Sequence, residues 1–177
     1  MIKLQELGNR ICIIGPSSSG KSTLAKKLSE RLNLPVCYLD QIAHFPNSNW
    51  KRREKKDLKI DHDIFLKNNR YWIIEGNYSF LMTDRFSNAT TVIWLDFKVT
   101  GTLIRYFIRT FKNSNSRIGN LDGVKTQISL KFVKYIVFDA PKNRKIYKKL
   151  IDQSNIKLLY IDSFHHLKKY YKKWNLH

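Results

Sequence analysis

The residues with the clearest chemical meaning form a short loop between an apolar run and a helical one. The segment Gly15-Pro16-Ser17-Ser18-Ser19-Gly20-Lys21-Ser22 fits the pattern G-x-x-x-x-G-K-[ST]. Small residues let such a loop turn successive backbone N–H groups inward, and the positive end of the following helix adds to the field on a polyphosphate. Lys21 would reach the β- and γ-phosphate oxygens, and the Ser22 hydroxyl would hold Mg²⁺. We therefore expect this loop, with Thr23, to bind ATP; the alternative is a Gly/Ser turn that binds nothing.

Acidic residues follow the ends of several apolar runs, namely Asp40, Glu75, Asp96 and Asp162. In an open parallel sheet, the carboxyl ends of the strands line the ligand crevice, so these acids should face the phosphates. For Asp96 and Asp162, a helix cap or turn is the simpler interpretation. Asp40 and Glu75 open polar, aromatic-containing loops. We expect Glu75 to hold the metal through water and Asp40 to orient or deprotonate the attacking hydroxyl of an acceptor.

The elements that position these residues can be predicted from hydrophobic patterning. Near-continuous apolar runs are typical of strands covered on both faces, and they span residues 10–14, 36–39, 71–74, 91–95 and 156–161. Apolar residues recur at helical spacing over residues 21–32, 102–112, 124–138 and 164–174. Strands that alternate with helices indicate an α/β fold with a parallel sheet. The polar segment 113–123 is predicted to be a mobile loop between two helices.

Length and composition exclude several classes of protein. A chain of 177 residues normally makes one domain, here 1–177, and 42% hydrophobic with 13% aromatic residues is too apolar for a disordered chain. The apolar runs fall far short of the roughly 20 residues needed to cross a bilayer. The first six residues include Gln5 and Glu6 where a signal peptide needs its apolar run, so we expect a cytoplasmic protein. Cys12 and Cys37 lie in apolar runs and are expected to be buried structural thiols.

The charge balance of 33 Lys+Arg against 14 Asp+Glu gives a net charge of +19. Such an excess raises the local concentration of phosphate-bearing partners. Basic residues gather in residues 51–56 and 141–177, which suits nucleic acid, although a solvated face is the commoner explanation. Tyr170, Tyr171 and Trp174, at helical spacing, are expected in the core.

Two runs downstream of the glycine-rich loop carry a resemblance to a known family. They are Leu39-Asp40-Gln41-Ile42-Ala43-His44-Phe45-Pro46-Asn47-Ser48-Asn49-Trp50 and Trp72-Ile73-Ile74-Glu75-Gly76-Asn77-Tyr78-Ser79. They resemble the DNA topology modulation (FlaR-like) proteins, which are adenylate-kinase-like P-loop proteins. The similarity covers residues from about 11 to 109. That family usually reads Asp-Gly-Asn-Tyr where this chain has Glu75. The resemblance implies a three-layer P-loop NTPase fold, with a five-stranded parallel sheet in the order 2-3-1-4-5, helices on both faces and a small lid.

The resemblance also suggests roles for residues beyond the loop. It implies that Arg105 and Arg109, with Arg117, belong to a lid at about 105–124 that closes over the phosphates. A solvated basic face is the alternative. Arg85 is expected to clamp a phosphate-bearing acceptor. The acceptor pocket would be walled by His44, Phe45, Trp50, Asn77 and Tyr78, although Phe45 and Trp50 would equally serve to pack their loop onto the body.

Taken together, these patterns predict an ATP- and Mg²⁺-dependent phosphotransferase. It would move the γ-phosphate to a nucleotide, a nucleoside or another small acceptor. The alternative is a nucleic-acid-associated, ATP-binding regulator with little or no kinase activity. A GTPase is disfavoured because the chain has no Asn-Lys-x-Asp guanine-reading motif. The acceptor and the oligomeric state are not predicted.

Overall fold

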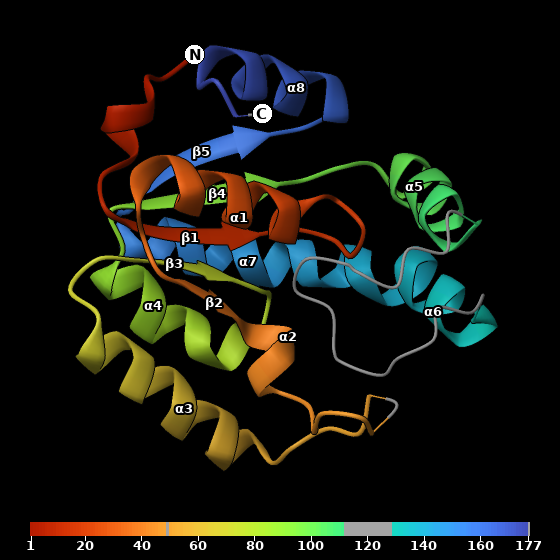
Figure 1. Cartoon of the computed structure of the whole chain (residues 1–177). Helices are drawn as coiled ribbons and strands as arrows, with labels where there is room; N and C mark the ends of the chain where they lie inside the picture. Colours follow the sequence, from red (N-terminus) through yellow and green to blue (C-terminus); the bar gives the residue numbers. More distant parts are fainter. Residues whose placement is uncertain (49, 112–128, 177) are drawn as a thin grey trace.

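The computed structural model describes residues 1–48, 50–111 and 129–176, except for the side chain of Arg109. Strands alternate with helices along the chain (Figure 1). The strands are β1 (Arg10–Ile14), β2 (Val36–Tyr38), β3 (Trp72–Glu75), β4 (Thr91–Leu95) and β5 (Lys157–Ile161). The helices are α1 (Lys21–Leu32), α2 (Leu39–Ile42), α3 (Lys55–Asn68), α4 (Met82–Asn88), α5 (Val99–Phe111), α6 (Leu130–Lys134), α7 (Ala140–Ser154) and α8 (Phe164–Lys173). Short turns of other helical types are η1 (Leu4–Leu7), η2 (Ser79–Leu81) and the π-helical η3 (Tyr135–Asp139).

The strands form one parallel sheet in the order β2-β3-β1-β4-β5, which confirms the predicted order. β1 lies at the centre, with Cys12 opposite Ile74 of β3 on one side and Val92 of β4 on the other. The carboxyl ends of all strands therefore meet at one edge, toward which the arrows in Figure 1 point. The glycine-rich loop, α2 and α5 lie at that edge.

Helices cover both faces of the sheet, so the predicted three-layer α/β architecture is confirmed. Successive residues of a strand point to opposite faces, and β1 shows this directly. Ile11 and Ile13 pack in a core with Leu28 of α1 and Leu167 of α8. Cys12 and Ile14 pack in the opposite core, with residues of α3, α4 and α7.

The predicted burial of the two cysteines is confirmed. Both are free thiols in the second core, and burial raises the pKa of Cys12 and of Cys37 to about 12. Tyr170 and Trp174 of the C-terminal segment are also buried, as predicted, while Tyr171 is half-buried. No helix among the described residues is long and apolar enough to cross a membrane.

Other predictions differ from the structure. The run 36–39 leaves the sheet after Tyr38, because Leu39 begins α2. Helix α3 was not predicted. Charged residues dominate its sequence, and the residues that it buries are Leu58 and His62. The predicted loop 113–123, the part of the lid beyond Phe111 and the first residues of the predicted helix 124–138 lie outside the described residues.

Helix α5 buries a different face from the one that its apolar pattern marks. Ile104, Ile108 and Phe111 are exposed. The buried side is formed instead by Thr102, Tyr106 and Thr110, at intervals of four residues. The apolar stripe of this amphipathic helix therefore does not belong to either core cluster.

Candidate functional site

The glycine-rich loop connects the central strand β1 to helix α1 at the carboxyl edge of the sheet. Gly15 has a φ of +147°, and a Cβ at this position would stand 2.3 Å from the backbone oxygen of Leu95. Gly20 has a φ of +94° and directly precedes α1. Only glycine adopts such angles without strain, and only glycine leaves room for the neighbouring β4 backbone. The loop conformation therefore depends on these two positions.

Asn77 ties the start of this loop to the end of β3. Its Oδ1 accepts a hydrogen bond from the Gly15 N–H at 3.0 Å, and its Nδ2 donates to the Gly15 carbonyl at 2.8 Å. The side-chain amide thus satisfies both backbone groups of one loop residue. Asn77 was expected to wall the acceptor pocket, but in the structure its amide anchors the glycine-rich loop.

Lys21 and Ser22, at the start of α1, converge on the carboxylate of Glu75. The Ser22 hydroxyl donates to Oε2 at 3.0 Å, and the Lys21 ammonium lies 3.6 Å from Oε1. Lys21 also donates to the Pro16 carbonyl at 3.1 Å. Glu75 is only 3% exposed, and burial raises its pKa above the usual value, against the opposing effect of Lys21. The longer glutamate side chain therefore does reach the hydroxyl beside the phosphate loop.

Asp40, in the first turn of α2, lies beside this cluster. Its Oδ1 accepts a hydrogen bond from the Tyr78 hydroxyl at 2.8 Å, and its backbone oxygen accepts one from Nδ1 of His44 at 2.9 Å. The carboxylate is close enough to Glu75 to act on its pKa, and it helps to raise the pKa of Tyr78, after burial. The structure thus brings together Asp40, His44 and Tyr78, which the sequence could only propose as neighbours.

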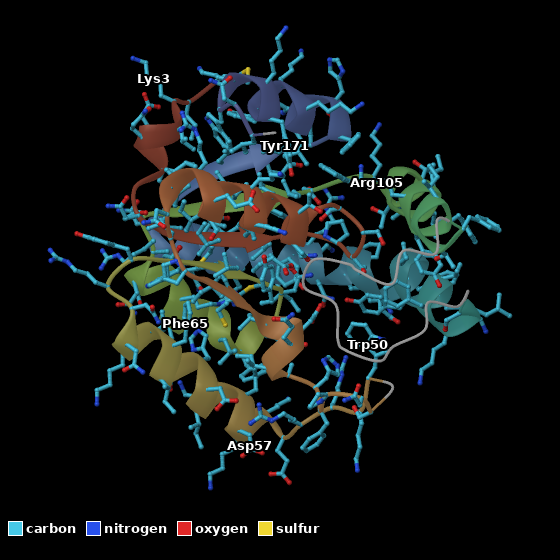
Figure 2. The ribbon with its side chains drawn as sticks, viewed as in Figure 1. Lys3, Trp50, Asp57, Phe65, Arg105 and Tyr171 are labelled. Carbon is cyan, nitrogen blue, oxygen red and sulfur yellow. The ribbon has the colours of Figure 1, made fainter. Side chains whose placement is uncertain are left out.

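Arg105 of α5 also contacts the glycine-rich loop. Its Nε donates to the Ser18 carbonyl at 2.9 Å, and its guanidinium lies 3.9 Å from the ring centre of Phe164 (Figure 2 labels Arg105). Burial lowers the pKa of this half-buried arginine. The side chain of Arg109 and the whole of Arg117 lie outside the described residues, so the rest of the proposed arginine set is not placed.

Arg85 does not occupy the position expected of a clamp on an acceptor. Its side chain is completely buried. The guanidinium donates to the carbonyls of Gly76 at 3.0 Å, Tyr78 at 3.4 Å and Leu81 at 3.4 Å. These carbonyls belong to the segment from Gly76 to Leu81, which follows β3. The buried guanidinium of Arg85 therefore stabilises the backbone of that segment.

Residues 43–48 and 50–53 form a small hairpin beside α2. His44 pairs with Arg52 in an antiparallel bridge, and the Phe45 N–H donates to the Lys51 carbonyl at 2.9 Å. Phe45 and Trp50 are exposed, whereas His44 is buried and meets the Trp50 ring edge-on at 5.1 Å between ring centres. Trp50 thus contacts the buried His44, while part of its own ring and of the Phe45 ring remains exposed.

Two residues near Asp40 were missed by sequence reasoning. Burial raises the pKa of Tyr78 and of Tyr135; the charge of Asp40 raises both pKa values further, and the charge of Arg52 opposes this effect. Tyr135 begins the π-helical turn η3. Arg52 was visible only as one member of a basic cluster. Tyr135, about a hundred positions away from Asp40 in the chain, gave no signal in the sequence.

The remaining acids at strand ends serve structural roles. Asp96 is buried and accepts hydrogen bonds from Arg144 Nη2 at 2.5 Å and the Tyr160 hydroxyl at 2.7 Å, which tie β4 to α7 and β5. It is therefore neither a helix cap nor a turn former. Asp162 is exposed and contacts His166 at 3.2 Å, directly before the Ser163 cap of α8.

The donor set at the loop suits a phosphate ligand with Mg²⁺. The hydroxyls of Ser18 and Ser19 are buried, and neither has a hydrogen-bond partner among the described residues. The described residues contain no group of three or more His, Cys, Asp or Glu side chains that could enclose a metal by themselves. Ser22 and Glu75 supply two oxygen ligands, and Mg²⁺ typically takes one or two protein ligands and completes its shell with phosphate and water. The residues present therefore fit a magnesium ion bound with a nucleotide.

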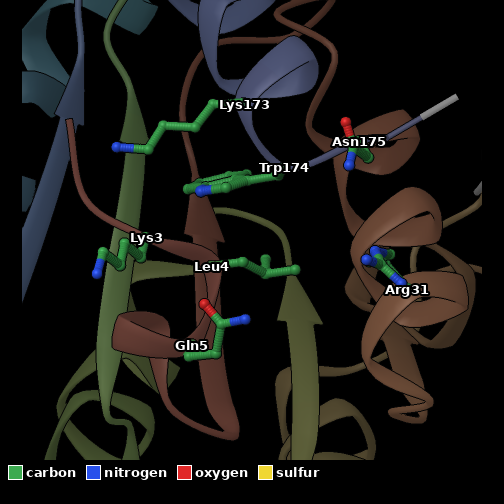
Figure 3. Close-up of a pocket in the computed structure, with 7 residues that line it drawn as sticks. All are labelled: Lys3, Leu4, Gln5, Arg31, Lys173, Trp174 and Asn175. Carbon is green, nitrogen blue, oxygen red and sulfur yellow. The ribbon is translucent and has the colours of Figure 1, made fainter.

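A separate cavity of about 230 Å³ lies away from the loop, between η1 and the ends of α1 and α8 (Figure 3). Its lining includes Lys3, Arg31 and Lys173. Arg31 and Lys173 stand in the last turns of α1 and α8, where cations offset the negative ends of the helix dipoles. Arg31 and Lys173 therefore stabilise the ends of their helices. Because the cavity also lies away from the loop, we do not include it in the candidate site.

No protein-family model matches this chain, and no curated protein matches it. Among solved structures, the chain is similar to the YorR protein from Bacillus subtilis, which was crystallised in complex with phosphorylated GDP. The two chains are 15% identical, the similarity covers 86% of this chain and 84% of YorR, and the TM-score is 0.45. A likeness of this degree carries no inference about ligand or activity.

Proposed function

We propose that this protein is an ATP-dependent phosphotransferase that moves the γ-phosphate of ATP to a hydroxyl or phosphate of an acceptor. The observation that carries the proposal is the convergence of Lys21 and Ser22 on the buried Glu75, with Asp40 beside them. A phosphate-binding loop alone would suit any nucleotide-binding protein. A second carboxylate beside the loop is the group that could accept the proton of an acceptor hydroxyl during phosphoryl transfer.

The phosphate loop performs the binding part of the reaction. Its backbone N–H groups and the Lys21 ammonium hold the β- and γ-phosphates, and the hydroxyls of Ser18 and Ser19 gain partners that they lack in the described residues. Ser22 and Glu75 would hold Mg²⁺, which when bound would supply positive charge next to the phosphate oxygens. Arg105 donates to the Ser18 carbonyl and so fixes the middle of the loop.

Asp40 performs the proton transfer. The Tyr78 hydroxyl donates to its Oδ1 at 2.8 Å and so orients the carboxylate, and no residue in the described part of the chain donates to the second oxygen, which we assign to the acceptor. As the acceptor hydroxyl attacks the phosphorus, its proton passes to Asp40. A positioned base of this kind typically contributes about 10²- to 10⁴-fold in rate.

The experiment is a transfer assay with γ-labelled ATP, Mg²⁺ and a panel of nucleosides, nucleotides and sugars. We expect Lys21→Ala to weaken ATP binding or abolish transfer with the fold intact. Lys26→Ala is the matched control, because Lys26 lies on the same helix and pairs only with the exposed Glu30. Equal ATP affinity in Lys21→Ala and wild-type protein would contradict the phosphate role of the loop.

The base is tested separately with Asp40→Asn. This variant should keep the wild-type affinity for ATP and lose at least about 100-fold in the rate of transfer. Asp162→Asn, at the end of β5, serves as the control for loss of one carboxylate. An unchanged rate in Asp40→Asn would remove the base from the proposal, and ATP-sensitive binding of DNA with no transfer to any acceptor would favour the nucleic-acid-associated regulator instead.

A further inference from the structure

Three exposed aromatic side chains lie on the two segments whose His44 and Tyr78 contact Asp40. Phe45 and Trp50 of the hairpin and Phe80 of η2 are 44%, 41% and 41% exposed. Exposed aromatic side chains that gather on neighbouring segments mark a candidate ligand-binding surface. We call these three rings, together with Lys51, Arg52 and Lys55, the aromatic platform. Of its residues, Figure 2 labels Trp50.

Cations lie on and between these rings. The Lys51 ammonium is 5.8 Å from the ring centre of Phe45, and that of Lys55 is 5.8 Å from the ring centre of Phe80. Arg52 lies between them in the chain. Among the described residues, none of these three cations forms an ion pair, whereas their neighbour Arg53 pairs with Asp61. The positive charge of the platform is therefore available to an anionic ligand.

The platform is connected to Asp40 through one intervening side chain on each side. Phe80 meets the ring of Tyr78 edge-on at 6.4 Å, and Tyr78 donates to Asp40. Trp50 meets the ring of His44 at 5.1 Å, and His44 donates to the backbone of Asp40. A ligand that stacks on Trp50 or Phe80 would thus lie one side chain away from Asp40. Its end could therefore be held at the Asp40 carboxylate, which accepts the proton.

Exposed aromatic faces interleaved with free cations are the features that bind single-stranded nucleic acid. The bases stack on the rings, and the phosphates contact the lysines and arginines. A mononucleotide would occupy one ring, whereas rings on two separate elements suit several consecutive nucleotides. The net charge of +19 speeds the association of such a polyanion.

We propose that the acceptor is a terminal sugar hydroxyl of a single-stranded nucleic acid, held by the aromatic platform with its end at Asp40. This inference rests on the proposed phosphotransferase function and specifies its substrate class. In the transfer step, the terminal hydroxyl oxygen forms a bond to the γ-phosphorus of ATP. The bond between that phosphorus and the β,γ-bridging oxygen breaks, ADP leaves, and the hydroxyl proton passes to Asp40.

The test uses the full chain, γ-labelled ATP, Mg²⁺ and short single-stranded oligonucleotides. One oligonucleotide carries a 5′-hydroxyl and a 3′-phosphate, a second carries a 5′-phosphate and a 3′-hydroxyl, and a third is blocked at both ends. We expect one of the first two to be labelled and the blocked one to remain unlabelled. Nucleosides and mononucleotides in parallel reactions should be poorer acceptors, with a KM at least about tenfold higher.

Variants of the platform separate it from general electrostatic attraction. Trp50→Ala and Phe80→Ala should each raise the oligonucleotide KM by about fivefold or more and leave the KM for ATP unchanged. Lys51→Gln with Lys55→Gln should raise that KM and make it less dependent on salt concentration. The matched control is Lys169→Gln with Lys172→Gln, which removes the same charge from the exposed face of α8. These residues are on the surface, so thermal unfolding should be little changed in every variant.

Each result decides between the two proposals. Labelling of a small acceptor without labelling of any oligonucleotide would overturn the nucleic-acid acceptor and leave the phosphotransferase intact. The same increase in KM from the α8 control as from the platform lysines would overturn the assignment of the platform. No transfer to any acceptor, together with unchanged ATP binding in Lys21→Ala, would overturn the phosphotransferase and this inference together.

Discussion

The two hydrogen bonds between Asn77 and Gly15 allow a quantitative prediction. Each bond contributes about 0.5–1.5 kcal/mol to stability, so Asn77→Ala should lower the free energy of unfolding by about 2 kcal/mol. For a domain of this size, that loss corresponds to a Tm about 4–8 °C lower. Because the bonds hold the first residue of the phosphate loop, the binding-competent loop should also become less populated. The ATP Kd should then rise by up to about 30-fold.

Thermal unfolding and calorimetric titration with ATP measure these two effects. Asn77→Asp should be more damaging than Asn77→Ala, because a carboxylate keeps the acceptor for the Gly15 N–H but faces the Gly15 carbonyl with a second oxygen. Asn69→Ala is the control: it removes one side-chain hydrogen bond, to the Phe65 carbonyl, at a distance from the site. It should lower the Tm by a smaller amount and leave the ATP Kd unchanged. A wild-type Tm and ATP Kd in Asn77→Ala, with a raised acceptor KM, would refute the anchor and restore Asn77 to the acceptor pocket.

Two further predictions concern buried groups beneath the site. Arg85→Met should lower the free energy of unfolding in urea by about 3 kcal/mol or more, because three backbone carbonyls lose a buried charged donor. Arg85→Lys should not restore the lost stability. A change confined to the acceptor KM would instead support a role of Arg85 as a clamp on the acceptor. Burial, and the positive charge of Arg85, lower the pKa of His62, so the unfolded chain binds the proton more readily than the folded one below the ordinary value of about 6.5. Stability should therefore fall as the pH drops below that value, and His62→Leu should reduce the slope in urea titrations between pH 5 and 7; an identical slope in this variant would exclude His62 as the cause.

Local patterns in the sequence predicted the elements well where burial is complete. β1, β4 and α1 have the predicted bounds, because a run covered on both faces, or a helix that begins directly after a glycine-rich loop, leaves a strong local signal. Helix α3 left a weaker signal, because its many charges obscure the apolar period. For α5 the apolar stripe was visible, but the face that contacts the rest of the described protein is the one with Thr102 and Tyr106.

The sequence by itself determined the α/β class, and it marked the glycine-rich loop and two carboxylates as candidates for the site. These depend on residue types at short spacing, and short spacing fixes geometry through the backbone alone. Only the tertiary structure decided how the side chains are used. The side chains of Asn77 and Arg85 hydrogen-bond to backbone groups of the loops, and Tyr135, far away in the sequence, lies close enough to Asp40 for that carboxylate to act on its pKa. A side chain's partner is set by which donors and acceptors remain unpaired once strands and helices have packed, and that outcome depends on the whole chain.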